Sequence, residues 1–454
     1  MPVHSPDVLI IGGGLAGLSA AIELSHRGRS VMVVEQKQRL GGRTYSFLHT
    51  ETGDEVDNGQ HLMMGCYHAT LRYLSTIEML HQVEIQENLS IVFRHPDRTP
   101  SFLKTFPFPA PFNVLAGLLQ LDHLSVPQRL SLLRVGLDLL LKNPDTSSYL
   151  QSITVKEWLD ALGQSERNKR ALWDIIAVGA LNDSTDKISA ALFVKVLKSA
   201  FFGNRMNASM VIPKAGLSTV LVDGAATYIK KKNGTILLNT SVDNVDINAS
   251  RIDLVRLNNG ETVQPRSVIS AVPYFDIPKV FGSGEAIGLK GLDNFISSPI
   301  ITLHLWFDAH FVKEKFVALI DSPIHWIFNK SAIYGREHQG LMYLSLVVSG
   351  AHAMAEMEKD DLVRIAQNEL HRFYPAAPLA KVIHALIIKE KRATFSPVVG
   401  IEKIRPKPAT IVSNLFLAGD WTDTKLPATI EGAVQSGYTS SFAAEKYLSF
   451  MRSI

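Results

Sequence analysis

Cysteine is almost absent from this sequence. The single Cys66 in 454 residues excludes an internal disulfide framework and any cysteine-rich metal or iron–sulfur site. We therefore expect no metal centre, and we expect Cys66 to be a small buried apolar residue. So few cysteines are also typical of a protein from a reducing compartment.

A strong excess of charge of one sign is missing too. Lysine and arginine total 46 against 43 aspartate and glutamate, which leaves a net charge of +3, and no long run of one sign concentrates this excess. Nucleic acid is therefore not an expected partner, because binding it needs a basic stripe or patch.

Targeting and membrane-spanning signals are also lacking. Residues 1–6 contain no basic region followed by an apolar stretch, which predicts no secretory signal and a cytoplasmic protein. The two stretches nearest to membrane-spanning length are broken, one by three prolines and the other by a glycine and two histidines. Mean hydropathy is nevertheless +0.10. This apolar surplus predicts a greasy substrate, a peripheral contact with the inner face of the membrane, or both.

What the sequence does contain begins with a strand, a turn and a helix. Asp7–Ile11 is an aliphatic run, and a small-residue helical stretch follows over 18–27. Between them, Gly12 allows a tight turn, Gly14 lets the backbone approach a pyrophosphate, and Gly17 permits close packing of helix on strand. The helix N-terminus would offer its unpaired N–H groups to the anion. This pattern predicts a Rossmann-like dinucleotide site.

A second strand and a second glycine pair refine this prediction. Ser30–Val34 leads into Glu35, which lies roughly 20 residues beyond the glycines, where an acidic side chain accepts hydrogen bonds from ribose hydroxyls. The next segment, Arg39–Thr44, carries a glycine pair and an arginine. It resembles the GGR motif of the amine oxidase and phytoene desaturase superfamily. The resemblance implies FAD, bound non-covalently, with Gly42 and Arg43 against the cofactor.

The C-terminal region resembles the part of that superfamily which completes the site. Leu415–Ala418 is a short apolar strand, and the resemblance implies that Asp420 just after it bonds a ribityl or phosphate-linked hydroxyl. A helix is predicted over 427–450, with a proline at its entry. Its early residues Thr429 and Ile430 are assigned to the cofactor, because the positive end of the helix dipole would point at the flavin.

The chain length predicts two domains, because 454 residues exceed the usual size of one. We assign 1–95, 210–285 and 395–454 to a Rossmann-like FAD-binding domain, and 96–209 and 286–394 to an α+β substrate domain. The fold class is thus α/β, with the substrate domain formed by two insertions. In the superfamily a strand of the middle segment holds adenine through its backbone, and this role would fall on Val242.

One helix of the substrate domain is unusually apolar. In Leu130–Lys142 three charged residues recur every four positions (Arg134, Asp138 and Lys142), which leaves one narrow polar stripe among leucines. We expect this helix to be buried in the domain core. The alternative is a helix that dips into a membrane surface.

Three further segments narrow the resemblance. Asp57–His61, Ala180–Asp183 and Ile212–Ser218 together resemble the squalene-associated flavoproteins, the hydroxysqualene dehydroxylases of bacterial hopanoid synthesis. The resemblance spans most of the chain. It implies a long isoprenoid substrate and reduction of hydroxysqualene to squalene, with hydride from reduced FAD and loss of the hydroxyl as water.

Such a dehydroxylation would need help for its leaving group. Hydroxide leaves poorly, so a proton donor or a strong hydrogen bond must assist it inside an apolar pocket. His61 is the candidate donor, with Asp57 as its candidate orienter. The two share a face only in a helix, and Gly59 argues against one; equally, this segment could only satisfy backbone or cofactor groups. The aromatic faces of Trp306 and Tyr343 could stabilise positive charge.

Other functions stay open at this point. A carotenoid-type or phytoene-type desaturase would share the FAD site but move hydride toward the flavin. An amine oxidase would need an aromatic cage beside it. A flavin-bearing scaffold that binds lipid or protein without turnover is an alternative of another class. Nothing in the sequence indicates the electron donor that reduces FAD.

Overall fold

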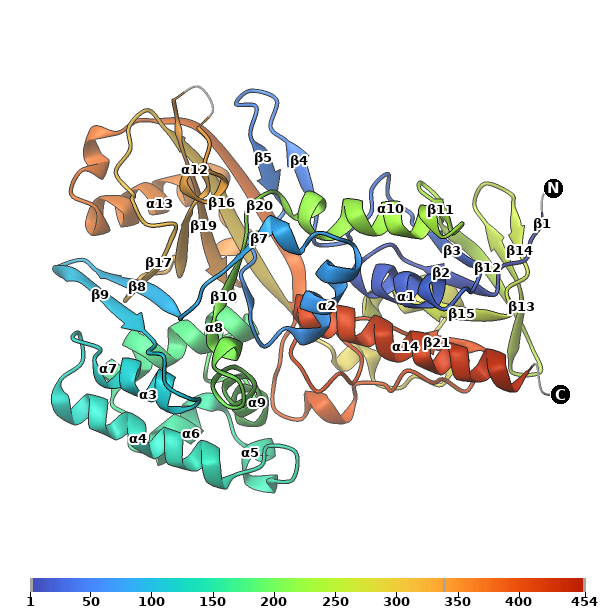
Figure 1. Ribbon diagram of the computed structural model, residues 1–454, viewed down its shortest axis with the longest axis horizontal. Helices are drawn as coiled ribbons and strands as arrows, with labels where there is room; N and C mark the ends of the chain where they lie inside the picture. Colours follow the sequence, from blue (N-terminus) through green and yellow to red (C-terminus); the bar gives the residue numbers. More distant parts are fainter. Residues whose placement is uncertain (1–2, 338–339, 452–454) are drawn as a thin grey trace.

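The computed structural model describes residues 3–337 and 340–451. It consists of two parts that lie side by side (Figure 1). One part is built around a parallel sheet and contains the chain ends, and the other combines a large sheet with a block of helices. One apolar cluster lies within the first part and another within the second, and a third contains buried residues of both.

A five-stranded parallel sheet forms the centre of the first part. Its order is β11 (Thr235–Leu237), β3 (Val31–Val34), β2 (Val8–Ile11), β15 (Ser267–Ser270) and β21 (Leu415–Leu417). The strands come from the beginning, the middle and the end of the chain. The central strands are aliphatic and buried, as strands covered on both faces must be. The α/β class and the Rossmann-like architecture are confirmed.

Two helices from opposite ends of the chain pack together beside this sheet. They are α1 (Leu15–His26) and α14 (Ile430–Phe450). A Cβ at Gly437 would lie 2.0 Å from Ser19 Oγ and 2.1 Å from the carbonyl oxygen of Ala16. Only a glycine therefore permits this approach, which brings the C-terminal segment to the glycine loop of β2 and α1.

Smaller elements surround the parallel sheet. One sheet consists of β1 (Val3–His4), β14 (Thr262–Val263), β13 (Arg251–Leu257) and β12 (Val242–Asn248). Another consists of β6 (Met63–Met64), β10 (Met210–Pro213) and β7 (Val83–Ile85). A hairpin pairs β4 (Ser46–Leu48) with β5 (Glu55–Asp57), and the remaining helices are α2 (His68–Thr76), α10 (Gly224–Lys231) and α11 (Ile277–Phe281).

A seven-stranded sheet dominates the second part. Its order is β20 (Val382–Phe395), β16 (Ser297–Phe307), β19 (Met342–Ser349), β18 (Trp326–Asn329), β17 (Phe316–Leu319), β8 (Ser90–His95) and β9 (Arg98–Lys104). Helix α13 (Lys359–Phe373) packs on it. The boundary expected at residue 95 is wrong, because β8 pairs with β9 and β17 and so belongs to this sheet.

The helical block consists of α3 (Phe112–Leu119), α4 (Val126–Leu141), α5 (Ser148–Ser152), α6 (Val155–Ala161), α7 (Glu166–Asn168), α8 (Asp174–Leu181) and α9 (Ala190–Phe201). The expectation that the 130–142 helix is buried almost all round is wrong. Helix α4 buries only Leu132, Val135 and Leu139, because it is the outer helix of the block and packs through one face (Figure 1). None of the helices in the described residues has the length and apolar character to cross a bilayer.

Candidate functional site

The loop between β2 and α1 leaves open space beside Gly14. A Cβ at Gly17 would lie 2.0 Å from the carbonyl oxygen of Gly12, so Gly17 permits the tight turn of helix on strand. A Cβ at Gly14 would instead meet nothing nearer than the Cα of Gly42 at 3.9 Å. The first-turn N–H groups of α1 have no partner within the helix. The loop thus offers an anion an unobstructed backbone cradle.

Glu35 is tied to this glycine loop. Its carboxylate accepts hydrogen bonds from the backbone N–H of Gly13 at 2.8 Å and of Lys37 at 2.9 Å. The backbone of Glu35 is hydrogen-bonded to the backbone of Leu237 and of Thr240. Thr240 lies two residues before Val242, the first residue of β12. Each carboxylate oxygen keeps acceptor capacity for a ribose hydroxyl. Glu35, Gly14 and Val242 therefore border one region of the first part.

The second glycine pair brings Arg43 to Asp420. Gly42 has a φ of +62° and touches Gly14, where its Cβ would be 3.2 Å from the Gly14 Cα. Arg43 donates to Asp420 Oδ2 at 2.8 Å and to the carbonyl of Ala393. Burial alone would lower the pKa of Arg43, but the Asp420 carboxylate, together with Glu390, outweighs it and raises that pKa. The Arg43 guanidinium is therefore fully charged at neutral pH.

Helix α14 points its N-terminus into the same region. It begins at Ile430, three residues later than the proline predicts, because Thr429 is the N-cap and accepts a hydrogen bond from Gly432 N at 3.1 Å. The backbone N–H of Gly419, just before Asp420, donates to Ser436 of this helix at 2.8 Å. The remaining first-turn N–H groups are free to face a ligand.

These features fit FAD. The open backbone at Gly14 suits a diphosphate, the Glu35 carboxylate suits a ribose, and the charged pair of Arg43 and Asp420 lies beside the end of β20. The ten residues that the sequence assigns to the cofactor lie in the two glycine loops, in the first turn of α1, just after β3 and β21, at the first residue of β12 and at the start of α14.

Asp57 forms a buried ion pair that the sequence did not indicate. Its Oδ2 accepts from Lys330 Nζ at 2.8 Å, and both side chains are 1% exposed. Lys330 begins the short helix α12 (Lys330–Tyr334) and also donates to Gln60 Oε1 at 2.6 Å. Oδ1 of Asp57 accepts from Ser46 Oγ and Leu217 N. Burial would raise the pKa of Asp57, but the Lys330 ammonium and the hydrogen bonds from Leu217 and Ser46 together outweigh it and lower that pKa.

His61 lies on the same segment without touching Asp57 through a hydrogen bond. Its Nδ1 lies 2.8 Å from the carbonyl oxygen of Gly59. The role of Asp57 as the orienter of His61 is therefore corrected: the segment after β5 is not helical, so side chains four residues apart do not share a face. Burial lowers the pKa of His61 below its usual value. The neutral imidazole thus carries its proton on Nδ1 and leaves Nε2 as an acceptor.

The segment of His61 adjoins the GGR arginine. Asn58 Nδ2 donates to the backbone carbonyl of Arg43 at 3.2 Å. A Cβ at Gly59 would lie 3.6 Å from Thr302 Oγ1 on β16. Residues 57–61 therefore lie between the cofactor motif and the large sheet.

Trp306 and Tyr343 cannot supply the aromatic wall considered for a positive charge. The two rings stack at 4.5 Å with an interplanar angle of 10°, and His49 stacks on Trp306 at 4.7 Å. The indole Nε1 donates to Asp54, and both aromatic residues are at most 1% exposed. These rings hold the β4–β5 hairpin against the large sheet, so no face is left for a ligand.

Sequence reasoning missed an aromatic cluster that adjoins Asp420. Trp421 lies within 6.5 Å of Tyr274 and 6.0 Å of Phe295, measured between ring centroids, and Phe295 meets Phe395 at 5.8 Å. Trp421 directly follows Asp420 in the sequence, but the three other rings of the cluster come from distant segments with no local signal. Lys330 was missed for the same reason.

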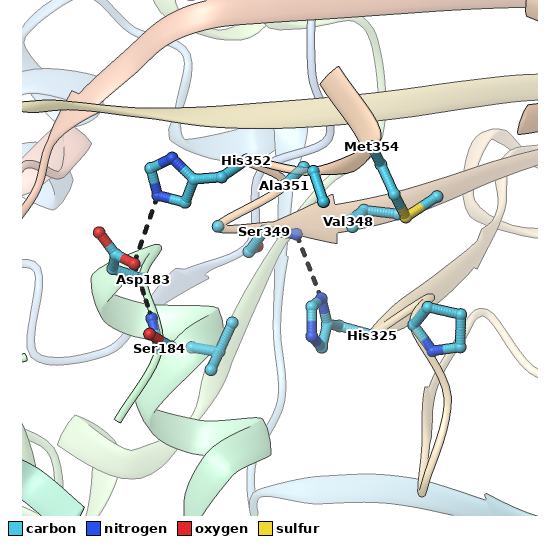
Figure 2. A pocket seen from close by; sticks show the side chains of 12 residues that line it. Asp183, Ser184, His325, Val348, Ser349, Ala351, His352 and Met354 are labelled. Atoms are coloured by element: carbon cyan, nitrogen blue, oxygen red, sulfur yellow. Dashed lines mark hydrogen bonds and ion pairs between the residues drawn. The ribbon is translucent and has the colours of Figure 1, made fainter. Parts of the chain in front are cut away.

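The Ala180–Asp183 motif lies at a separate pocket of about 250 Å³ (Figure 2). There Asp183 points toward His352, with its Oδ1 3.4 Å from His352 Nε2, and its Oδ2 accepts from Ser396. Asn182 donates to the Ser298 carbonyl and to Thr394. The motif thus joins the helical block to β16 and β20.

Comparison with known proteins agrees with this geometry. Residues 15–443 match the family model described as flavin-containing amine oxidoreductase. A hydroxysqualene dehydroxylase of Zymomonas mobilis is 26% identical over 95% of this chain and 97% of its own length. A 15-cis-phytoene desaturase of Glycine max is 24% identical over 96% of this chain and 79% of its own. The cyclohexylamine oxidase of Brevibacterium oxydans shares the fold, with a TM-score of 0.70 at 17% identity over 98% of this chain and 99% of that one.

Proposed function

Because the chain belongs to the family of flavin-containing amine oxidoreductases and is an FAD-dependent oxidoreductase, we propose that it reduces hydroxysqualene to squalene. The observation that carries the proposal is the position of Asp57–His61. This segment marks the resemblance to the hydroxysqualene dehydroxylases, and Asn58 attaches it to Arg43 of the cofactor motif. Relatives of that name align over nearly the whole chain.

The proposed reaction breaks the allylic C–O bond and forms a C–H bond in its place. Bound FAD, when reduced, supplies the hydride and both electrons. The hydroxyl oxygen takes a proton and leaves as water. The chain must therefore hold an apolar isoprenoid beside the flavin and deliver one proton to the departing oxygen.

His61 can deliver that proton only as an imidazolium. In the neutral ring the proton sits on Nδ1 and is donated to Gly59, so Nε2 has nothing to give. Since burial lowers the pKa of His61, the charged form becomes common only below the ordinary value of ~6.5. Reduction of the alcohol should therefore accelerate as the pH falls from neutral through that lowered pKa.

The same geometry favours one second candidate, an isoprenoid desaturase. A neutral His61 with a free Nε2 is suited to accept a proton from substrate carbon while hydride moves to the flavin. A 15-cis-phytoene desaturase relative is about as similar as the dehydroxylase. This function has the opposite pH dependence, because protonation of His61 would remove the base.

His61→Ala tests the residue itself. We expect the reoxidation of reduced FAD by hydroxysqualene, measured without oxygen, to slow by about 100-fold to 10,000-fold, the usual loss for a general acid. The flavin spectrum should stay unchanged, because His61 has no hydrogen bond to the assigned cofactor residues.

The matched control is His371→Ala, which removes an exposed histidine of α13. Its rate should equal that of the parent protein. A His61→Ala rate within roughly threefold of the parent, far short of a general-acid loss, would exclude His61 as the donor. If hydroxysqualene reoxidises neither parent nor variant, the proposed function itself fails.

A further inference from the structure

Helix α4 presents an apolar face to the outside of the molecule. Figure 1 shows it at the outer edge of the helical block. Its inner side chains, Leu132, Val135 and Leu139, are at most 5% exposed. Those of the outer face are 40% to 75% exposed: Val126, Leu130, Leu133, Leu137, Leu140 and Leu141. Their spacing of three or four residues gathers them into one stripe along the helix.

Two exposed aromatic side chains lie at the start of the neighbouring helix α3 and just before it. Phe112, the first residue of α3, is 62% exposed, and Phe108 in the preceding loop is 49% exposed. Helix α3 packs against α4. Exposed apolar residues that occur singly are ordinary, but a gathered set such as the α4 stripe marks a contact surface.

The charges that flank the stripe are basic. Helix α4 and its C-cap carry Arg129, Arg134 and Lys142 against one carboxylate, Asp138. That carboxylate is occupied, because it accepts from Trp158 Nε1 at 2.9 Å and pairs with Lys142 at 2.8 Å. The two arginines remain in excess along the helix: Arg134 is exposed, and Arg129 is half-buried and donates to the Leu119 carbonyl. Lys142 also lies over the ring of Tyr149, which is 42% exposed.

The combination of exposed apolar and basic side chains on α4 favours a lipid surface over a protein as the partner. A second copy of this chain would bring the same basic residues against each other. An anionic bilayer would instead accept the leucines among its acyl chains and the arginines among its headgroups. A tyrosine beside a lysine suits the boundary between the two zones.

We propose that α4, with Phe108 and Phe112 beside it, is the docking surface through which the protein lies on an anionic lipid bilayer without crossing it. The bilayer that α4 contacts would be the phase in which the isoprenoid of the proposed function dissolves. Only this source of the substrate rests on the proposed function. The docking surface itself rests on the exposure of the apolar side chains of α4 and on the basic residues beside them.

Vesicle sedimentation tests the proposal. The FAD-loaded protein is mixed with vesicles of phosphatidylglycerol and phosphatidylcholine, and a variant with Leu137→Ser and Leu140→Ser is compared with the parent. We expect the variant's partition into vesicles to fall by about 100-fold, as the loss of two buried leucines implies. Vesicles of phosphatidylcholine alone should bind the parent several-fold more weakly.

The matched control carries Leu379→Ser and Ile411→Ser, which remove exposed apolar residues away from α4. It should bind like the parent. Equal binding by the α4 variant would overturn the proposal, as would a parent that ignores vesicles but forms a dimer which the α4 variant abolishes. Flavin reoxidation by detergent-dissolved hydroxysqualene should be unchanged in the α4 variant, so failure of the docking surface and failure of the proposed function are separable.

Discussion

Lys330→Met is expected to destabilise the protein by about 3–5 kcal/mol, the cost of leaving a buried charge without its partner. Asp57 would keep its bonds to Ser46 and Leu217 but lose the only cation that its carboxylate contacts among the described residues. The measurement is the free energy of unfolding by chemical denaturant, with flavin content followed in parallel.

An exposed pair provides the control. Lys391 pairs with Glu356, and these side chains are 60% and 74% exposed. Lys391→Met should therefore cost at most about 1 kcal/mol. Adding Asp57→Asn to Lys330→Met should recover part of the loss, because it removes the stranded charge. If Lys330→Met costs no more than Lys391→Met, the buried pair does not secure the segment that carries His61.

Gly14→Val is expected to abolish FAD retention while leaving the fold intact. The new side chain meets no protein atom within 3.4 Å at its Cβ, so it costs little in folding, but it fills the space assigned to the diphosphate. A loss of ~3 kcal/mol of binding corresponds to an affinity roughly 100-fold lower. The ratio of flavin to protein absorbance after purification measures it. Glu35→Ala should also weaken retention, because it removes the ribose acceptor.

Two other glycines separate this effect from misfolding. Gly136→Ala lies in open space on α4 and should keep full flavin. Gly17→Val would collide with the Gly12 carbonyl and should prevent folding. Stoichiometric flavin in both Gly14→Val and Glu35→Ala would show that the cofactor lies elsewhere.

The strand, glycine turn and helix of the cofactor motif could be predicted because their signals are local. A strand, a glycine turn and a helix follow one another within a few residues, and their geometry depends on residues that are neighbours in the chain. The predicted start of α14 was too early, because Thr429, and not the proline before it, is the N-cap of the helix.

The substrate half was less predictable, because it depends on contacts between distant residues. Lys330 and Asp57 are 273 positions apart, and no local pattern joins them. For α4 the periodicity identifies its faces, but not which neighbour covers them. Trp306 and Tyr343 fit any buried strand. Only the pairing of β16 with β19 brings the two rings together, and only the β4–β5 hairpin places His49 on Trp306.

The direction of hydride transfer is the central claim, and product analysis by mass spectrometry tests it most directly. The dithionite-reduced protein is incubated without oxygen with hydroxysqualene, and the oxidised protein is incubated separately with squalene. We expect squalene to form in the first sample, up to one molecule for each bound FAD, and the squalene of the second to remain unchanged. Consumption of squalene by the oxidised protein, with hydroxysqualene left intact by the reduced one, would contradict the dehydroxylase and identify a desaturase.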